Sequence, residues 1–434
     1  MKNSSTWAAL RNPVFRRLWF AAVISGTCVA AHDSAATWTM NFFTASPLLL
    51  SLMSTVASLP FFLFILPAGA LADKVNRQKL VCTVNVCLAA TAFSLAVLGW
   101  LHLLNPYLIL GCAFFLGVGF AVNAPAWTSI VPQVVSDTEL PSAATLSGLQ
   151  FNISGIIGPA IGGLLIPPAG ASFVFALNAA GFLLVVLATR QWKQPTVAAK
   201  LPSESYFESF GTMTRYVRRA PGFQVVLVRN FLFALFISVI PALMPVLGLK
   251  VLHLSSSNLG LSFTSMGAGS VVGAVLIIPW LRARFSPDSV TVPANLLLVS
   301  VYVLMALVRH TEVFFLLAAL AGVGWTISAS ELWVAAQRTM PGCARGRMNA
   351  TLIMISQGAM ALGGVIWGSV AALAGTSYTL LGAAVLFLTS LFLARPLSID
   401  FAGNLEEKVS GVSSVRVKPK EITRIALTKE LLAA

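Results

Sequence analysis

The sequence predicts an all-α membrane protein in which twelve transmembrane helices form two six-helix bundles. Of its 434 residues, 57% are hydrophobic and 10% are charged, and the mean hydropathy is +0.85. A water-soluble domain of this length needs more polar surface, so most of the chain is expected to lie in lipid. The apolar runs are continuous rather than alternating, which predicts helices. A weak internal repeat at a spacing of 205 residues predicts two related halves.

Apolar stretches of about twenty residues, the length that crosses a hydrocarbon core as a helix, define the individual spans. The first six are expected at residues 17–41, 48–71, 80–101, 106–130, 141–166 and 172–190. The second six are expected at residues 223–248, 257–281, 289–309, 313–336, 347–373 and 377–394. The chain is therefore divided into an N-terminal segment 1–16, a bundle 17–190, a central loop 191–222, a second bundle 223–394 and a tail 395–434.

The repeat is carried mainly by small residues. Gly117, Val118 and Gly119 recur as Gly322, Val323 and Gly324; Asn152 corresponds to Gln357, Gly158 to Gly363, and Ala169, Gly170 and Ser172 to Ala374, Gly375 and Ser377. A unit of this length is too long for a solenoid repeat. In apolar sequence it indicates duplicated bundles related by an axis along the membrane normal, an arrangement common among transporters.

The basic residues fall on one side of the predicted spans. They lie before the first span, after the second, in the central loop, after the eighth and tenth spans, and in the tail, whereas only Lys250 and Arg309 fall in loops of the other side. By the positive-inside rule, both termini and Cys343 are expected to be cytoplasmic, in a multi-pass protein of the bacterial inner membrane. The net charge of +14 then reflects topology and contact with anionic lipid, and no nucleic-acid partner is expected.

Other classes of function find little support in the residues. The five cysteines show neither CxxC spacing nor a nearby histidine cluster, so no disulfide framework, metal site or cofactor is expected. No Gly-Lys-Ser/Thr phosphate loop occurs, which argues against direct ATP coupling. The run after Arg16 and Arg17 is too long for a cleavable signal, and the first span is expected to remain as an anchor. The chain is not expected to be an enzyme, and we expect a monomer powered by an ion gradient.

Several short motifs carry a family resemblance. A charged loop after the second span contains Gly69, Asp73, Arg77 and Lys79, and the fifth span contains Gly158, Pro159, Gly162 and Gly163. With the segments 15–19, 33–40 and 208–221, these residues resemble the major facilitator superfamily and, within it, the transmembrane secretion effector branch of enterobactin-exporter-like and macrolide-efflux-like carriers. The likeness covers about residues 10–395. It implies a gating role for the charged loop and an antiporter role for the fifth-span motif.

The repeat preserves only the bases of the charged loop. Arg77 corresponds to Arg282 and Lys79 to Arg284, while Asp73 falls on Ile278. The acidic part of the loop therefore belongs to the first half alone.

Asp33 is the first candidate for proton coupling. It lies about four residues, or ~6 Å, past the midpoint of the first span, and an ionisable group at such a depth is a functional hypothesis by default. Its helical neighbours Gly26, Ala30 and Thr37 form a small and polar face, which suits contact with protein or water. The alternative is a hydrogen-bonded acid that fixes helix packing.

Glu331 in the tenth span is the second proton-coupling candidate. An ion pair with Arg338 or Arg229 is an equal alternative for it. For Arg229 itself, contact with an anionic substrate, pairing with Asp33 or Glu331, and snorkelling to the interface all remain open.

The remaining candidates concern the cavity and the fifth helix. Asn123, Asn152 and Gln357 offer neutral hydrogen bonds inside the bundles, and together with Arg229 they are the cavity candidates. Gly158 and Pro159 allow a bend, which predicts either a hinge or simple close packing.

Taken together, these features predict a secondary active transporter. We expect proton-coupled export of a hydrophobic or amphipathic small molecule by alternating access, and the resemblance implies a drug, a macrolide or a siderophore. An importer or a lysolipid flippase on the same fold, and a non-transporting membrane receptor or scaffold, are the alternatives.

Overall fold

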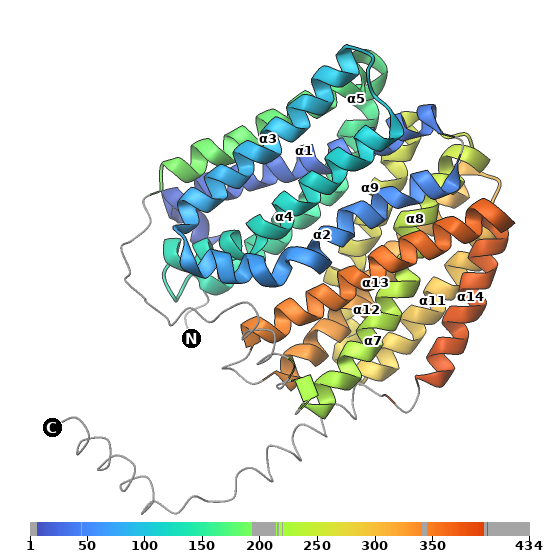
Figure 1. Ribbon diagram of the computed structural model, residues 1–434. Coiled ribbons are helices and arrows are strands. Elements are labelled where there is room, and N and C mark those ends of the chain that lie inside the picture. Colours follow the sequence, from blue (N-terminus) through green and yellow to red (C-terminus); the bar gives the residue numbers. More distant parts are fainter. Residues whose placement is uncertain are drawn as a thin grey trace, which may run out of the picture.

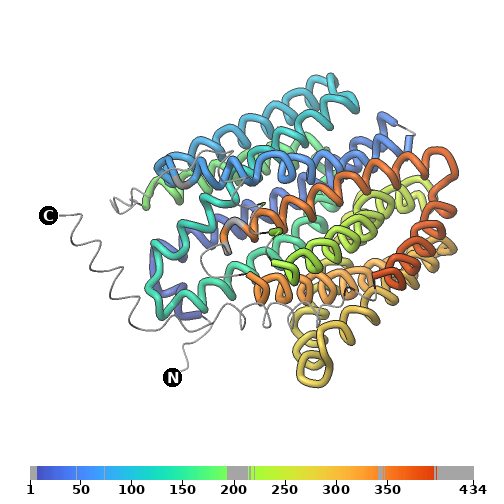
Figure 2. The backbone as a smooth tube through the Cα atoms, turned by 60° about the horizontal axis from the view of Figure 1, so that its bottom comes forward, coloured from blue at the N-terminus to red at the C-terminus, as the bar shows by residue number. Residues whose placement is uncertain are grey.

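The computed structural model describes residues 7–44, 46–192, 220–340 and 345–394, together with residues 214, 217, 218 and 397. Within these ranges the chain is helical and contains no strand. Two groups of helices lie side by side, one formed by α1 to α5 and the other by α7 to α14 (Figure 1). In the rotated view the helices of the second group, yellow-green to red, gather toward the lower right (Figure 2).

The N-terminal bundle is formed by helices α1 to α5. Its helices are α1 (Pro13–Phe43), α2 (Pro47–Lys74), α3 (Arg77–Trp100), α4 (Pro106–Val134) and α5 (Leu140–Arg190), preceded by the short helix η1 (Ala8–Arg11). The side chain of Asn12 accepts hydrogen bonds from the backbone of Val14 and Phe15, and Pro13 occupies the first turn. Such a cap explains why α1 starts four residues before the predicted span.

The C-terminal bundle has more interrupted helices. One span joins α7 (Pro221–Ile237), α8 (Val239–Val246) and the π-helical turn η2 (Leu247–Val251), and the next joins α9 (Ser256–Val272), the π-helical turn η3 (Gly273–Ile277) and α10 (Ile278–Arg282). The last four spans are α11 (Pro287–Leu307), α12 (Thr311–Thr339), α13 (Arg345–Ala374) and α14 (Thr376–Leu393).

The predicted set of twelve spans is confirmed. The described residues contain 11 helical stretches that are long and apolar enough to cross a membrane. One of these, α5, has 51 residues, and Gly170 within it has the non-helical angles φ 79° and ψ 161°. This glycine divides α5 into two spans. The predicted central loop 191–222, the tail 395–434 and Cys343 lie largely or wholly outside the described residues, and so does the start of the segment 1–16.

The 205-residue repeat recurs in the backbone and in the packing. Gly170 and Gly375, which are 205 positions apart, are the two described glycines with positive φ, at 79° and 87°. Each sits in the turn that leads into the last span of its half, a conformation that an L side chain adopts only with strain. A Cβ added to Gly158 would lie 2.6 Å from the Cβ of Ala30, and one added to Gly363 would lie 2.8 Å from the carbonyl oxygen of Leu235, the repeat counterpart of Ala30.

The most extensive contacts between the described halves are made by two helix pairs, α2 with α13 and α5 with α9. We call the end of the molecule at which α1 begins the terminal face, and the opposite end, where Gly170 and Gly375 lie, the distal face. The Thr55 hydroxyl on α2 donates to the carbonyl oxygen of Ala361 on α13 at 3.1 Å, and a Cβ added to Gly163 on α5 would lie 2.5 Å from the carbonyl oxygen of Ser256 on α9. The close glycine contacts between the described halves lie from the middle of the helices to the distal face.

Candidate functional cavity

A cavity of about 730 Å³ lies inside the molecule at the level of the first span's centre. Helices of the N-terminal bundle form almost all of its wall. From the C-terminal half, Pro241 and Pro245 of α8 and Phe263 of α9 complete it. Its size falls within the range of about 300–1,000 Å³ that is typical of small-molecule sites.

Asp33 lines this cavity and lies on the helix face that the sequence predicts to be small and polar. Gly26, Ala30 and Thr37 line it as well, so the small and polar face of α1 is turned toward the cavity. The side chain of Asp33 is exposed to this space, although the residue lies deep within the protein. Among the described residues, no ion pair or hydrogen bond engages its carboxylate; Thr37 donates to its backbone carbonyl at 2.8 Å. The neighbouring His32 is 2% exposed, and its ring contacts that of Phe175 with centroids 4.7 Å apart.

The C-terminal half is tightly packed at the position that corresponds to Asp33 in the repeat. Ser238, the repeat counterpart of Asp33, lies between α7 and α8, is fully buried, and donates its hydroxyl to the carbonyl oxygen of Leu235 at 2.6 Å. Pro241 follows at the start of α8, and a proline removes the hydrogen bond to the carbonyl four residues earlier. The related helices α1 and α7 therefore differ in role: α1 lines a cavity, and α7 joins a packed core.

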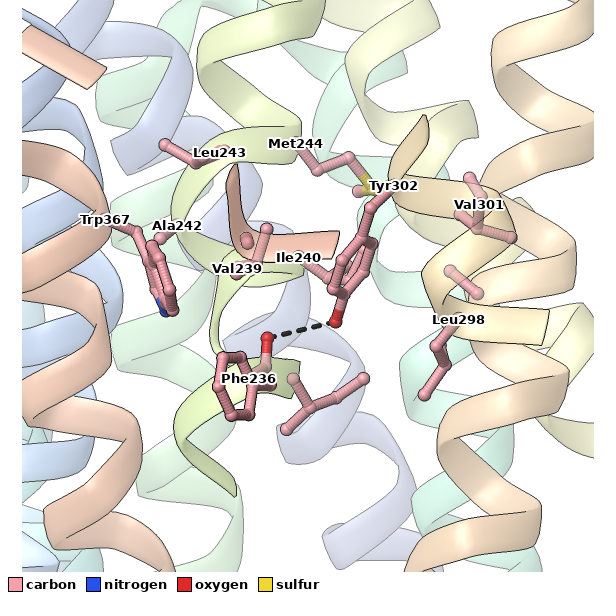
Figure 3. Packing of buried hydrophobic residues seen from close by; sticks show 14 of the residues in the cluster. Phe236, Val239, Ile240, Ala242, Leu243, Met244, Leu298, Val301, Tyr302 and Trp367 are labelled. Carbon is pink, nitrogen blue, oxygen red and sulfur yellow. Dashed lines mark hydrogen bonds between the residues drawn. The ribbon is translucent and has the colours of Figure 1, made fainter. Parts of the chain in front are cut away.

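Aromatic side chains fill the space around this helix break (Figure 3). The Tyr302 hydroxyl donates to the carbonyl oxygen of Phe236, and the Trp367 indole donates to that of Leu235, each at 3.0 Å. In a membrane, carbonyl groups freed by a break must find partners within the protein. The rings of Phe236 and Phe387 stack with centroids 4.9 Å apart and complete the core.

The neutral cavity candidates divide into two groups. Asn123 lines the cavity and accepts a hydrogen bond from Asn85, another lining residue, at 3.3 Å. Asn152 and Gln357 are not among the lining residues. Gln150, which the sequence did not single out, lines the cavity and donates to the carbonyl oxygen of Ala22 at 3.3 Å.

Arg229 is placed apart from the cavity. It is 8% exposed, and its guanidinium lies 3.4 Å from a carboxylate oxygen of Asp288 at the start of α11. It also donates to the carbonyl oxygen of Leu397 at 3.4 Å. Of the alternatives for Arg229, an ion pair is observed, but its partner is neither Asp33 nor Glu331.

Glu331 is held in an ion pair within the C-terminal bundle. Its carboxylate is 2% exposed and accepts a hydrogen bond from Nε of Arg282 at 2.7 Å. Arg282 is the repeat counterpart of Arg77, so one of the bases retained in the second half has a structural partner on α12. The pair that we observe involves neither Arg338 nor Arg229.

Removing Arg282 and removing Glu331 should lower the stability of the protein by unequal amounts. The Arg282→Gln variant leaves a buried carboxylate without its base, and we expect a loss of stability of about 2–3 kcal/mol, below the 3–5 kcal/mol of fully buried pairs because Arg282 is 43% exposed. Glu331→Gln leaves only a solvent-accessible guanidinium and should be milder. The thermal midpoint of each purified variant in detergent measures this difference. Equal midpoints for the two variants would contradict it.

The charged-loop residues lie at the terminal face. Asp73 is next to the last residue of α2, but its side chain lies outside the described residues. Arg77 begins α3, and the Asn76 side chain caps that helix by accepting from the backbone of Lys79 at 3.0 Å. A Cβ added to Gly69 would meet no atom within 4 Å. A gating role for this loop stays a prediction.

The fifth-helix motif packs against both halves. A Cβ added to Gly162 would lie 2.5 Å from the carbonyl oxygen of Ala31, so this glycine and Gly158 bring α5 against α1. On the other side of the helix, Gly163 faces Ser256, and the carbonyl of Pro159 lies against Gly260 of α9. The motif thus occupies the junction between α1, α5 and the opposite half. Close packing is observed directly, and the hinge role stays a prediction.

Two related six-span bundles, with a cavity lined mainly by the first and completed by helices of the second, match the architecture of major facilitator transporters. The family model for the transmembrane secretion effector matches residues 4–418. The chain belongs to this family.

Among the curated relatives, two kinds of efflux protein recur. Macrolide efflux protein A of Streptococcus pyogenes is 21% identical over 265 residues, which cover 61% of this chain and 65% of the relative. Enterobactin exporter EntS of Citrobacter koseri is 25% identical over 272 residues, covering 61% of this chain and 63% of the relative. The chain thus spans somewhat less than two thirds of the length of these relatives.

Solved transporter structures share the fold. A bacterial homolog of the human lysosomal transporter Spinster, in an inward-facing and unoccupied conformation, superposes with a TM-score of 0.71 at 14% identity, covering 94% of this chain and 99% of the other. The nucleoside transporter NupG gives a TM-score of 0.71 at 13% identity, covering 88% of this chain and 98% of NupG.

Proposed function

We propose that this protein is a secondary active transporter that exports a hydrophobic or amphipathic small molecule in exchange for protons. The cavity that carries Asp33 is the observation on which this proposal rests, because it offers a site of small-molecule size beside an unpaired carboxylate. The names of the curated relatives, a macrolide efflux protein and an enterobactin exporter, favour export over import. The alternatives remain an importer or lysolipid flippase and a non-transporting receptor or scaffold.

Alternating access supplies the mechanism that we propose. The inter-bundle contacts of Thr55 and Gly163 hold the halves together toward the distal face. Rocking of one bundle against the other about the central cavity would release these contacts and form new ones near the terminal face. The packed core around Ser238 suits such a motion, because it allows the C-terminal half to move as a rigid body.

Asp33 is our candidate for the coupling site. A charged carboxylate in a cavity closed from water is costly, and protonation removes that charge. The protonation state therefore biases which opening of the cavity is favoured, and this bias lets a proton gradient drive the cycle.

A lysine latch is proposed at the distal face. The Lys250 ammonium, at the end of η2, donates to the carbonyl oxygens of Thr44 at 2.8 Å and Asn41 at 3.4 Å. These carbonyls belong to the C-terminal end of α1, where backbone acceptors lack helical partners and the helix dipole favours a cation. Lys250 therefore ties the second half to the first.

Removal of this ammonium should weaken distal closure. In the Lys250→Met variant we expect a cysteine introduced at Ser257, on the α9 surface that faces Gly163, to react faster with a thiol reagent than in the parent. The loss of one charge-assisted hydrogen bond, at the lower end of the range of about 1.5–3 kcal/mol, sets the scale at roughly tenfold or more. Lys250→Arg keeps the charge and serves as control. Unchanged reactivity in Lys250→Met would remove the latch from the mechanism.

The proposed orientation places the terminal face in the cytoplasm. Among the described lysines and arginines, only Lys250 and Arg309 lie at the distal face, which agrees with the positive-inside rule. In a cysteine-free background, Leu103→Cys at the distal face should be labelled in intact cells by an impermeant thiol reagent. Asp137→Cys at the terminal face should be labelled only after permeabilisation. The opposite pattern would reverse the orientation.

Transport itself is tested with a panel of dyes, antibiotics and siderophores. Cells with the protein should accumulate less of at least one compound than cells without it, and collapse of the proton gradient should remove the difference. Accumulation that rises with the protein indicates an importer. A phenotype that persists when α5 and α9 are crosslinked across the halves indicates a receptor or scaffold.

A further inference from the structure

Among the described residues that line the cavity, Asp33 supplies the acidic group. No lysine or arginine is present among these lining residues. The ion pairs described above, Arg229 with Asp288 and Arg282 with Glu331, lie elsewhere and do not involve Asp33. Among the described residues, therefore, no base neutralises this carboxylate.

A carboxylate that is withdrawn from water needs a positive charge to neutralise it. Here that charge must come from something that enters the cavity. A proton can supply it, and so can a cation. We infer that the substrate is an organic cation with a hydrophobic body, and that it competes with the proton for Asp33. This inference rests on the proposed function, because it names the substrate class of the same cavity.

The rest of the wall suits the body of such a molecule. Phe61, Phe120, Trp127, Phe151 and Phe182 contribute aromatic surface, and the faces of such rings attract organic cations. An anionic substrate would meet an acid and no base, which disfavours carboxylates and deprotonated catechols. The cavity therefore discriminates between the two charge classes by its own composition.

The titratable groups near Asp33 are few. Among the described lining residues, His32, next to Asp33 on α1, is the other titratable one, and its ring is packed against Phe175. The lining residues of α2, α3, α4, α5, α8 and α9 are apolar side chains, hydroxyls, amides and glycines. Competition predicts that cation binding tightens as the pH rises, since deprotonation of Asp33 frees the site.

Two ions of the same shape and opposite charge test the inference directly. The full-length protein in lipid nanodiscs is dialysed against tetraphenylphosphonium or tetraphenylborate, with empty nanodiscs as background. The wild type should bind the cation saturably and release protons on binding. Asp33→Asn should weaken this binding by about tenfold or more, the scale of one ion pair in a partly wet cavity. Asp33→Glu should retain it, and Glu312→Gln, an exposed acid at the distal face, should leave it unchanged.

Gly155 offers the reverse experiment. It lines the cavity, and a Cβ added there would meet no atom within 4 Å, so the first atom of a side chain can be placed there without a clash. Gly155→Lys supplies the missing base and should weaken cation binding by about tenfold. Gly155→Met has a similar length without the charge and measures the steric part of the effect, so Gly155→Lys should bind the cation more weakly than Gly155→Met.

The outcomes separate the inference from the proposed function. Saturable borate binding as tight as phosphonium binding, absent phosphonium binding, or an Asp33→Asn variant with unchanged phosphonium affinity would each overturn the inference. Export of a neutral or anionic compound that is independent of Asp33 would overturn it while leaving the transporter assignment intact. Cation binding as expected, with no transport of any compound, would instead sustain the site and refute the transporter.

Discussion

The Asp33→Asn variant is expected to lose all gradient-driven accumulation of substrate. An amide cannot give up the proton that it imitates, so the charge change that couples the proton gradient to the cycle is abolished. Proteoliposomes energised by a pH difference measure the effect, with a substrate identified from the compound panel. Wild-type protein should build a substrate gradient, whereas the variant should reach equal concentrations on both sides. Exchange of labelled for unlabelled substrate needs no net proton movement and should persist at saturating substrate.

Two further variants decide whether Asp33 acts through its charge. Asp33→Glu restores a titratable group one methylene longer and should recover part of the accumulation. Glu312→Gln removes an acid that lies at the distal face, away from the cavity, and should accumulate substrate like the wild type. If Asp33→Asn still accumulates substrate against its gradient, Asp33 has a structural role. Glu331 then becomes the leading candidate, with Arg282 as the base that it must exchange for a proton.

The spans could be predicted from the sequence because each must carry a continuous apolar run of bilayer length. The exact ends of the helices depend on local features such as helix caps, which a hydropathy profile does not take into account. Helix α1 starts at Pro13 rather than residue 17, since Asn12 caps it, and α4 continues to Val134, four residues past the predicted end. The turn at Gly170 falls in the gap predicted between the spans 141–166 and 172–190, and Gly170 and its repeat partner Gly375 both have a positive φ.

The cavity was predictable only in part. Helical periodicity put Gly26, Ala30 and Thr37 on the face of Asp33, and that face does line the cavity. The partners of the buried charges were not predictable, because each pair joins helices distant in sequence: Arg229 and Asp288 are 59 positions apart, and Arg282 and Glu331 are 49 apart. Such pairs depend on how each helix is rotated about its own axis.

The asymmetry of the two halves also lay beyond the sequence pattern. A repeat predicts equivalence, yet Asp33 faces a cavity while its counterpart Ser238 is fully buried. The difference arises from side chains on α11, α13 and α14 that pack around the break between α7 and α8. Tyr302 on α11 and Trp367 on α13 are two of these side chains. Only the assembled packing reveals that one half is hollow and the other solid.

The Gly163→Ala variant is expected to slow transport strongly, whereas Gly148→Ala on the same helix should be silent. The new methyl group at position 163 would lie 2.5 Å from the carbonyl oxygen of Ser256, so α5 and α9 must move apart. Overpacking of this kind costs about 1–3 kcal/mol, and here it falls on the state in which the distal face is closed. At position 148 an added Cβ meets no atom within 4 Å.

The readout is the initial rate of substrate transport, measured beside the reactivity of a cysteine at Ser257 of the same interface. We expect a slower rate and faster labelling in Gly163→Ala, because a penalty of ~1 kcal/mol or more shifts the population of the closed state about fivefold or beyond. Gly148→Ala should match the parent in both measurements. If Gly163→Ala transports at the parental rate with unchanged labelling, the α5–α9 contact does not control the cycle, and the α2–α13 contact of Thr55 and the Lys250 latch would have to close the distal face.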